Sequence, residues 1–172
     1  MRSLTESRGS SRAAALGVVT ALALIFSYIE FLVPLPIAIP GIKLGLANIV
    51  VLISLYALGP RYAFFVNVTR IALAALLFGS LFSALYALAG GLVSFTAMAL
   101  LKRTKLFSCA GVSMAGGVFH NLAQLTVAAL LVETSQVFYY FPVLLLAGMA
   151  TGIGIGILAT LILRAIAPDS LS

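Results

Sequence analysis

The chain alternates between long runs of apolar residues and short breaks, and six such runs can be drawn along it. They cover residues 13–33, 44–58, 62–78, 81–101, 109–131 and 137–163. A helix needs about 20 apolar residues to cross a bilayer core of ~30 Å. Most of the runs approach or exceed that length. The second, at about 22 Å of helix, either begins in the preceding loop or does not cross completely. The pattern therefore predicts six helices.

Composition places these helices in a membrane. Of the 172 residues, 63% are hydrophobic and 8% are charged, whereas a soluble domain carries roughly 25% charged residues. The mean hydropathy is +1.22. A soluble fold of this length cannot bury so much apolar surface. Disordered and soluble globular classes are therefore excluded, and the lipid bilayer is the expected surrounding.

Lysine and arginine set the orientation, because short cytoplasmic loops are enriched in them. With the N-terminus in the cytoplasm, the following basic residues fall on the cytoplasmic side: Arg2, Arg8, Arg12, Arg61, Lys102, Arg103, Lys105 and Arg164. Only Lys43 falls outside, and Arg70 lies within a span. We expect an all-α membrane protein of six transmembrane helices with both termini cytoplasmic. The expected divisions are a tail at 1–12, a single domain at 13–165 and a tail at 166–172.

The net charge of +6 does not predict a nucleic-acid partner, because the basic residues are scattered and form no continuous basic face. The chain also holds a single cysteine, Cys109. An internal disulfide framework and a cysteine-based zinc site are therefore excluded.

Arg70 is the most informative polar residue. It lies about nine residues into the third run, roughly 13 Å deep at helical rise. An arginine at the bilayer centre costs ~2.5–3.5 kcal/mol and persists only beside a partner or a polar cavity. Asn67 shares its helix face, three positions earlier. Two interpretations stay open: Arg70 pairs with a buried carboxylate such as Glu30 and joins two helices, or it faces a cavity and binds an anionic group.

A second polar group occurs near the middle of the fifth run, at His120, Asn121 and Gln124. The spacing places these side chains within about one turn of each other, so they are not expected to face lipid. Hydrogen bonding between helices and a binding site are both open interpretations. A metal site is not expected, since a single histidine offers too few ligands.

Glu30, Lys43, Asn48 and Glu133 lie toward the outer ends of the first, second and fifth runs. Each alone is typical of a side chain solvated at the interface. Together with Arg70 they make the outer half more polar than the inner half, which predicts a cavity that opens outward. The loop 34–43 is the expected lid, because its prolines limit its freedom.

Small residues recur every four positions in two helices. Ala13, Gly17 and Ala21 do so in the first run, and Gly148, Gly152 and Gly156 in the last. Such stripes let helix backbones approach closely. For the stripe in the last run we favour packing inside this chain. For the stripe in the first run, packing inside the chain and contact with an external partner are equally open interpretations.

The sequence lacks the motifs of several common catalytic and nucleotide-binding sites. The chain lacks a P-loop sequence for ATP phosphates. Its only aspartate, Asp169, is in the tail, so clustered carboxylates for magnesium-dependent diphosphate chemistry are missing. The sole histidine has no aspartate in any run to orient it. We therefore expect no catalytic residues, no metal and no cofactor, and a protein that binds and translocates rather than an enzyme.

Three motifs resemble those of a bacterial membrane family. They are Pro40-Gly41-Ile42-Lys43-Leu44-Gly45-Leu46-Ala47-Asn48-Ile49, the run Gly111 to Gly117 leading to His120-Asn121-Leu122-Ala123-Gln124, and Tyr140-Phe141-Pro142. Together with Arg70, they resemble the family known as heptaprenyl diphosphate synthase component I or Gx transporter. The resemblance covers about residues 13–165 and implies the bacterial cytoplasmic membrane as the location.

This family in turn resembles the six-helix substrate-binding S components of energy-coupling-factor vitamin transporters. The resemblance implies that Ala13, Gly17 and Ala21 dock to a transmembrane coupling subunit driven by ATPases. It also implies a substrate site in the outer half. The residues expected there are Glu30, Lys43, Asn48, Asn67, Arg70, His120, Asn121 and Gln124.

Two functions follow as hypotheses. The first is a membrane subunit that binds and imports a small anionic organic solute or cofactor precursor. The second is a non-catalytic membrane component of a heptaprenyl diphosphate synthase or isoprenoid-quinone pathway, with a soluble prenyl diphosphate synthase as its partner.

Overall fold

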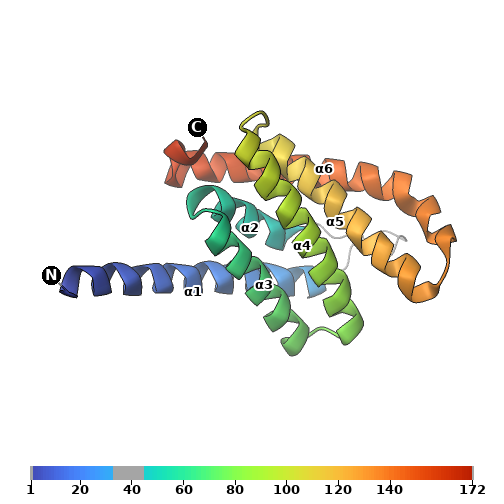
Figure 1. Ribbon diagram of the computed structural model, residues 1–172, viewed down its shortest axis with the longest axis horizontal. Helices are drawn as coiled ribbons and strands as arrows, with labels where there is room; N and C mark the ends of the chain where they lie inside the picture. The colour runs from blue at the N-terminus through green and yellow to red at the C-terminus, as the bar shows by residue number, and fades with distance from the viewer. Residues whose placement is uncertain (1, 33–44, 172) are drawn as a thin grey trace.

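The structure is a bundle of six α-helices and two short 3-10 helices, and the part of the chain it describes contains no strand (Figure 1). This computed structural model describes residues 2–32 and 45–171, with side chains from residue 13 onward. The elements are α1 (Arg2–Leu32), α2 (Leu46–Ala57), α3 (Pro60–Leu77), α4 (Leu81–Thr104), α5 (Cys109–Val132), η1 (Ser135–Tyr140), α6 (Phe141–Ile166) and η2 (Pro168–Leu171). The six predicted helices are thus found among the described residues, with boundaries close to those of the apolar runs except at the start of α1.

Helix ends form where the sequence places turn residues. Ser80 and Ser83 cap the start of α4 reciprocally, through bonds of 3.2 and 2.8 Å between backbone nitrogens and side-chain oxygens. Ser108 accepts from the backbone nitrogen of Gly111 at the start of α5. Pro60 opens α3, where its missing N–H costs nothing. These caps satisfy the exposed amides of the first turns and define where the helices begin.

Within the described residues, four helical segments are long and apolar enough to cross a membrane: Ala13–Leu32, Leu81–Thr104, Cys109–Val132 and Ser135–Ile166. Large apolar side chains point outward from them, as at Leu81, which is 77% exposed. Such exposure is stable in lipid rather than in water. The described chain is therefore that of a membrane-embedded helical protein.

Helix α2 is short and central. Its 12 residues extend about 18 Å, and it contacts α1, α3 and α6. Leu52 and Leu55 are fully buried there. A helix packed on several sides needs no continuous polar face, which explains why Asn48 and Ser54 are its only side chains that are neither aliphatic nor aromatic. Its length agrees with the short second run.

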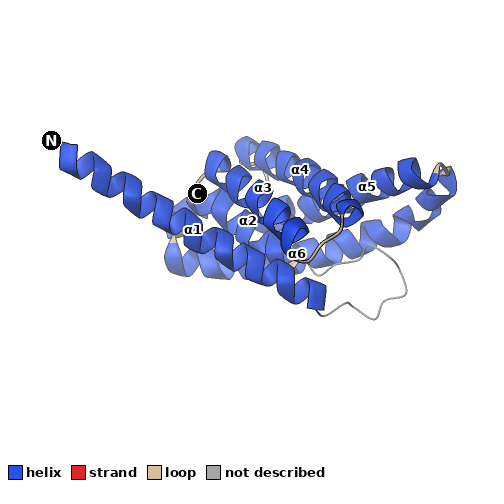
Figure 2. Cartoon of the chain, turned by 90° about the horizontal axis from the view of Figure 1, so that it is seen from below, coloured by secondary structure: helices blue, strands red, loops and turns tan. Residues whose placement is uncertain are grey.

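The helices pass back and forth, so that the N- and C-termini lie at the same end of the bundle (Figure 1). The turn between α2 and α3 and the loop between α4 and α5 lie at that end as well. The N-terminal half of α1 projects beyond the other helices (Figure 2). Helix α1 begins at Arg2, well before the apolar run at residue 13. The expected lid at 34–43 lies outside the described residues.

Glycines bring α5 and α6 into close contact. An added Cβ at Gly148 would lie 2.8 Å from the carbonyl oxygen of Gly117, and one at Gly152 would lie 2.7 Å from the Cα of Met114. At Gly156 it would lie 2.5 Å from the Cα of Ala110. This stripe therefore packs inside the chain, as the sequence pattern favours.

Candidate functional site

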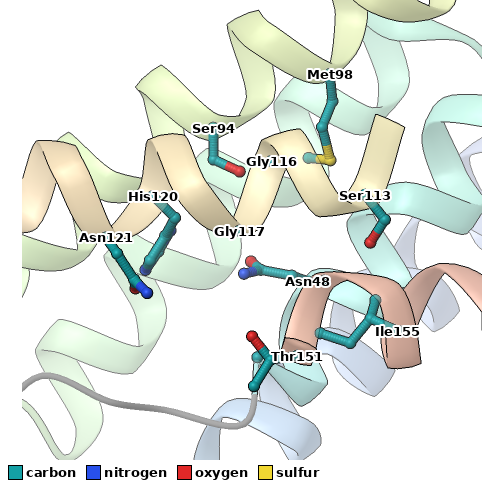
Figure 3. Close-up of a pocket in the computed structure, with 12 residues that line it drawn as sticks. Asn48, Ser94, Met98, Ser113, Gly116, Gly117, His120, Asn121, Thr151 and Ile155 are labelled. Atoms are coloured by element: carbon teal, nitrogen blue, oxygen red, sulfur yellow. The ribbon is translucent and has the colours of Figure 1, made fainter. Parts of the chain in front are cut away.

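A small polar cavity lies where α2, α4, α5 and α6 meet (Figure 3). Its polar lining residues are Asn48, Ser94, Ser113, His120, Asn121 and Thr151. Its volume is about 30 Å³, which is enough to hold about two water molecules. A larger solute therefore requires the surrounding helices to separate.

Asn48 comes from the first turn of α2, and in Figure 3 it faces the pair His120 and Asn121 on α5. The Nδ2 of Asn121 donates to the carbonyl oxygen of Leu144 on α6 at 2.8 Å. That bond fixes the amide, so its Oδ1 remains as an acceptor. The cavity thus combines side chains from helices far apart in the sequence.

Two glycines lie close to side chains that line the cavity. Gly90 on α4 lies against the His120 ring, since an added Cβ would meet its Cε1 at 2.8 Å. The same Cβ would meet Gln124 Cγ at 3.0 Å. Gln124 therefore packs beside His120 but is not among the cavity-lining residues. Gly45 lines the cavity. Its φ is +74°, a conformation that glycine adopts without strain, and an added Cβ would meet the Cδ1 of Ile155 at 2.8 Å.

Arg70 is buried next to this cavity and holds three helices together. Its Nη2 donates to Asn48 Oδ1 at 2.8 Å and to Asn67 Oδ1 at 3.0 Å, and its Nη1 donates to Ser27 Oγ at 3.4 Å. Asn67 Nδ2 in turn donates to the carbonyl oxygen of Gly91 on α4 at 3.0 Å. Arg70 is 8% exposed, so these bonds replace part of its hydration. Its buried Nε has no hydrogen-bond partner among the described residues. Arg70 does not line the cavity itself but reaches it through Asn48.

Glu30 has a different partner from the one the sequence suggests. Its Oε1 accepts from the backbone nitrogen of Leu46 at 2.8 Å. Helix α2 has glycine at its N-cap and no side-chain cap of its own, so a carboxylate from α1 takes that role. The hydrogen bonds of Arg70 go to Ser27, Asn48 and Asn67, and none goes to Glu30.

Of the expected site residues, Asn48, His120 and Asn121 line the cavity, and Asn67 and Arg70 form the adjoining hydrogen-bond network. Glu30 lies outside that network and bonds to the start of α2. Lys43 lies outside the described residues.

Three further polar residues line the cavity and are not predicted from the sequence: Ser94, Ser113 and Thr151. Ser113 precedes Gly117 by four positions and Asn121 by eight. The helical repeat of polar and small residues on α5 is therefore the signal that could find this face.

The small-residue stripe of α1 faces away from the bundle. Ala13, Gly17 and Ala21 are all exposed, and an added Cβ at Gly17 would meet nothing within 4 Å. Only a small part of the apolar segment of α1 is buried inside the chain. This face is therefore open to lipid or to another membrane protein.

No group of three or more His, Cys, Asp and Glu side chains that could hold a metal ion occurs among the residues with described side chains. The arrangement can donate and accept hydrogen bonds inside a membrane bundle, beside a buried cation.

Fold and site together define a helical membrane protein with a polar cavity beside a buried arginine. The family described as heptaprenyl diphosphate synthase component I matches residues 19–162, and the chain belongs to this family. No curated protein and no solved structure matches the chain.

Proposed function

We propose that this protein is a substrate-binding membrane subunit that imports a small anionic organic solute or cofactor precursor, in the manner of an energy-coupling-factor S component. The observation that carries the proposal is the bond from Arg70 Nη2 to Asn48 Oδ1. It connects a buried guanidinium to a side chain of the cavity. A permanent cation is costly at this depth, and a purely structural role needs no cavity beside it.

The chemistry of recognition follows from that bond. Because Arg70 occupies Oδ1 of Asn48, the Nδ2 of Asn48 is left to donate into the cavity. A carboxylate or other oxygen acceptor on the solute would meet this amide, with the positive potential of Arg70 behind it. Asn121 Oδ1 and the cavity hydroxyls would bind polar hydrogens on the rest of the solute. Lys43 belongs to the proposed site through the family motif alone.

Loading requires motion, because the cavity is far smaller than the ~300–1,000 Å³ of typical ligand sites. Helix α2 is the proposed moving wall. It meets α6 through the approach of Gly45 to Ile155. Separation of these two elements would enlarge the cavity toward the outer face.

In the proposed topology all six helices cross the bilayer, with both termini in the cytoplasm of a bacterial cell. The charge distribution supports it, because exposed Arg61, Arg103, Lys105 and Arg164 all lie on the turns and helix ends at the end of the bundle where the termini lie. On α1, the exposed stripe of Ala13, Gly17 and Ala21 would dock to a transmembrane coupling subunit with ATPases.

A second function is supported by the family description, which names a component of heptaprenyl diphosphate synthase. In that case the chain would be a non-catalytic membrane subunit, and its partner would be a soluble prenyl diphosphate synthase. The end of the bundle that carries the exposed basic residues would then be the surface that contacts the synthase.

Purification of the tagged full chain from its native membrane in mild detergent tests both functions. Mass spectrometry then identifies the proteins and small molecules that accompany it. A transmembrane subunit with ATPases, together with a solute that His120→Ala loses and Thr126→Ala retains, supports import. Thr126 is the matched control, because it is exposed on the same helix and bonds only within it. A soluble synthase without a retained solute contradicts import and supports the second function.

A further inference from the structure

A second cavity, separate from the polar one, opens at the basic end of the bundle. It lies between the start of α5, the last turns of α6 and η2, and its volume is about 410 Å³. Ser108, Ile157, Leu161, Arg164 and Leu171 are among its lining residues. We call it the α5–α6 groove. Its volume is within the range of small-molecule sites.

The walls of the groove are apolar and reach the surface. Ile157 is 53% exposed and Leu161 is 57% exposed. Both lie on α6, on one of the segments apolar enough to cross a membrane. In a bilayer, an apolar hollow of this size that reaches the surface would be filled by hydrocarbon, because an empty space forfeits dispersion contacts.

The rim of the groove is cationic. Arg164 lies in the last turn of α6 and is exposed. Opposite it, Ser108 is the N-cap of α5, where the first-turn amides and the helix dipole favour negative charge. No acidic residue lines the groove, and Asp169 on the neighbouring η2 is outside the lining. Arg103 and Lys105, both exposed, precede Ser108 in the chain.

We propose that the α5–α6 groove binds one anionic phospholipid. Its phosphate would bind Arg164 and the first turn of α5, and one acyl chain would lie along Ile157 and Leu161. Zwitterionic lipid would enter the same groove less well, because its headgroup carries a cation that Arg164 repels. This site is independent of the proposed import function, since it shares no residue with the polar cavity.

The chain has no tryptophan, so a single introduced tryptophan reports only on its own surroundings. Ile157→Trp places the reporter in the groove. The full-length variant is reconstituted in vesicles of equal parts phosphatidylglycerol and phosphatidylcholine, with brominated acyl chains on one lipid or on the other. We expect phosphatidylglycerol to quench with about five-fold higher apparent affinity, the equivalent of ~1 kcal/mol for one arginine near an anionic headgroup.

Two further variants and a control test whether the groove causes the preference for phosphatidylglycerol. Adding Arg164→Ala to Ile157→Trp should bring the two lipids to equal quenching, whereas adding Arg164→Lys should keep most of the preference. Leu100→Trp is the matched control, because Leu100 is exposed on α4 one turn from Arg103 but lies outside the groove. Its quenching should show less than a two-fold preference.

Three results would overturn the proposal. The first is equal quenching by both lipids at Ile157→Trp. The second is a preference as large at Leu100→Trp, which would mean general attraction to the basic surface. The third is no quenching by either lipid at Ile157→Trp while Leu100→Trp is quenched, which would mean that protein covers the groove.

Discussion

Arg70 on α3 donates from its Nη2 to the side-chain oxygen of Asn48 on α2, at 2.8 Å. The bond joins residues 22 positions apart and connects a buried guanidinium to the wall of the polar cavity. Asn67, on Arg70's own helix, accepts from the same nitrogen. One guanidinium therefore both holds the helices together and orients an amide that faces the cavity.

Replacing Arg70 should destabilise the bundle in a graded way. Arg70→Ala leaves the buried oxygen of Asn67 without this donor, at ~1–3 kcal/mol, and the partly buried oxygen of Asn48 at a smaller cost. Arg70→Lys should be intermediate, because a single ammonium cannot reproduce the planar fork that reaches three acceptors. Circular dichroism during titration with a denaturing detergent measures the loss. Unchanged unfolding of Arg70→Ala would show that the network contributes nothing to stability.

Asn48→Asp separates the structural role of this residue from its proposed role in binding. The carboxylate still accepts from Arg70, so the variant should unfold at a detergent concentration close to that of the parent. It removes the Nδ2 donor and adds negative charge to the cavity, so an anionic solute that accompanies the parent should be lost. Asn48→Ala should lose both stability and solute. Retention of the solute by Asn48→Asp would mean that Asn48 does not contact it.

The six helices can be predicted from the sequence because apolar runs and helix-ending residues are local signals. The short second run matches the 12-residue α2. What a local signal cannot give is tertiary position. That α2 is buried against α1, α3 and α6, and that α1 extends back to Arg2 beyond its apolar part, depends on contacts and on helix propensity outside the hydrophobic pattern.

The site can be predicted in part for the same reason. Asn48, His120 and Asn121 are recognisable because amides and imidazoles in apolar helices are costly unless they have a partner. Thr151 cannot be recognised as a cavity residue from the sequence. Its hydroxyl donates to the carbonyl oxygen of Ala147 within its own helix at 2.8 Å, so a threonine can occur at any position of an apolar helix at little energetic cost. Glu30 caps α2 only because the fold brings α1 to that point.

Gly152 and Gly154 form a matched pair for testing the packing of α5 against α6. Gly152→Ala places a Cβ 2.7 Å from the carbonyl oxygen of Ser113. Because that oxygen belongs to the backbone of α5, it cannot move aside as a side chain could. We expect a loss of ~1–3 kcal/mol of stability. Gly154 has nothing within 4 Å, so Gly154→Ala should be neutral or stabilising, since alanine favours the helix by up to ~1 kcal/mol. Detergent unfolding of both variants tests this, and equal losses would contradict it.

The exposed stripe on α1 predicts a variant that folds normally but loses its partner. Gly17→Leu adds a side chain where nothing lies within 4 Å, so unfolding should be unchanged within ~0.5 kcal/mol. A partner helix that approaches closely over Gly17 would be displaced, because close contact between membrane helices depends on small residues. The proteins that co-purify with each variant give the measurement. Val18→Leu is the control, because Val18 is 71% exposed on the same helix but lies outside the stripe. If Gly17→Leu keeps every partner that Val18→Leu keeps, the stripe faces lipid and docking must use another surface.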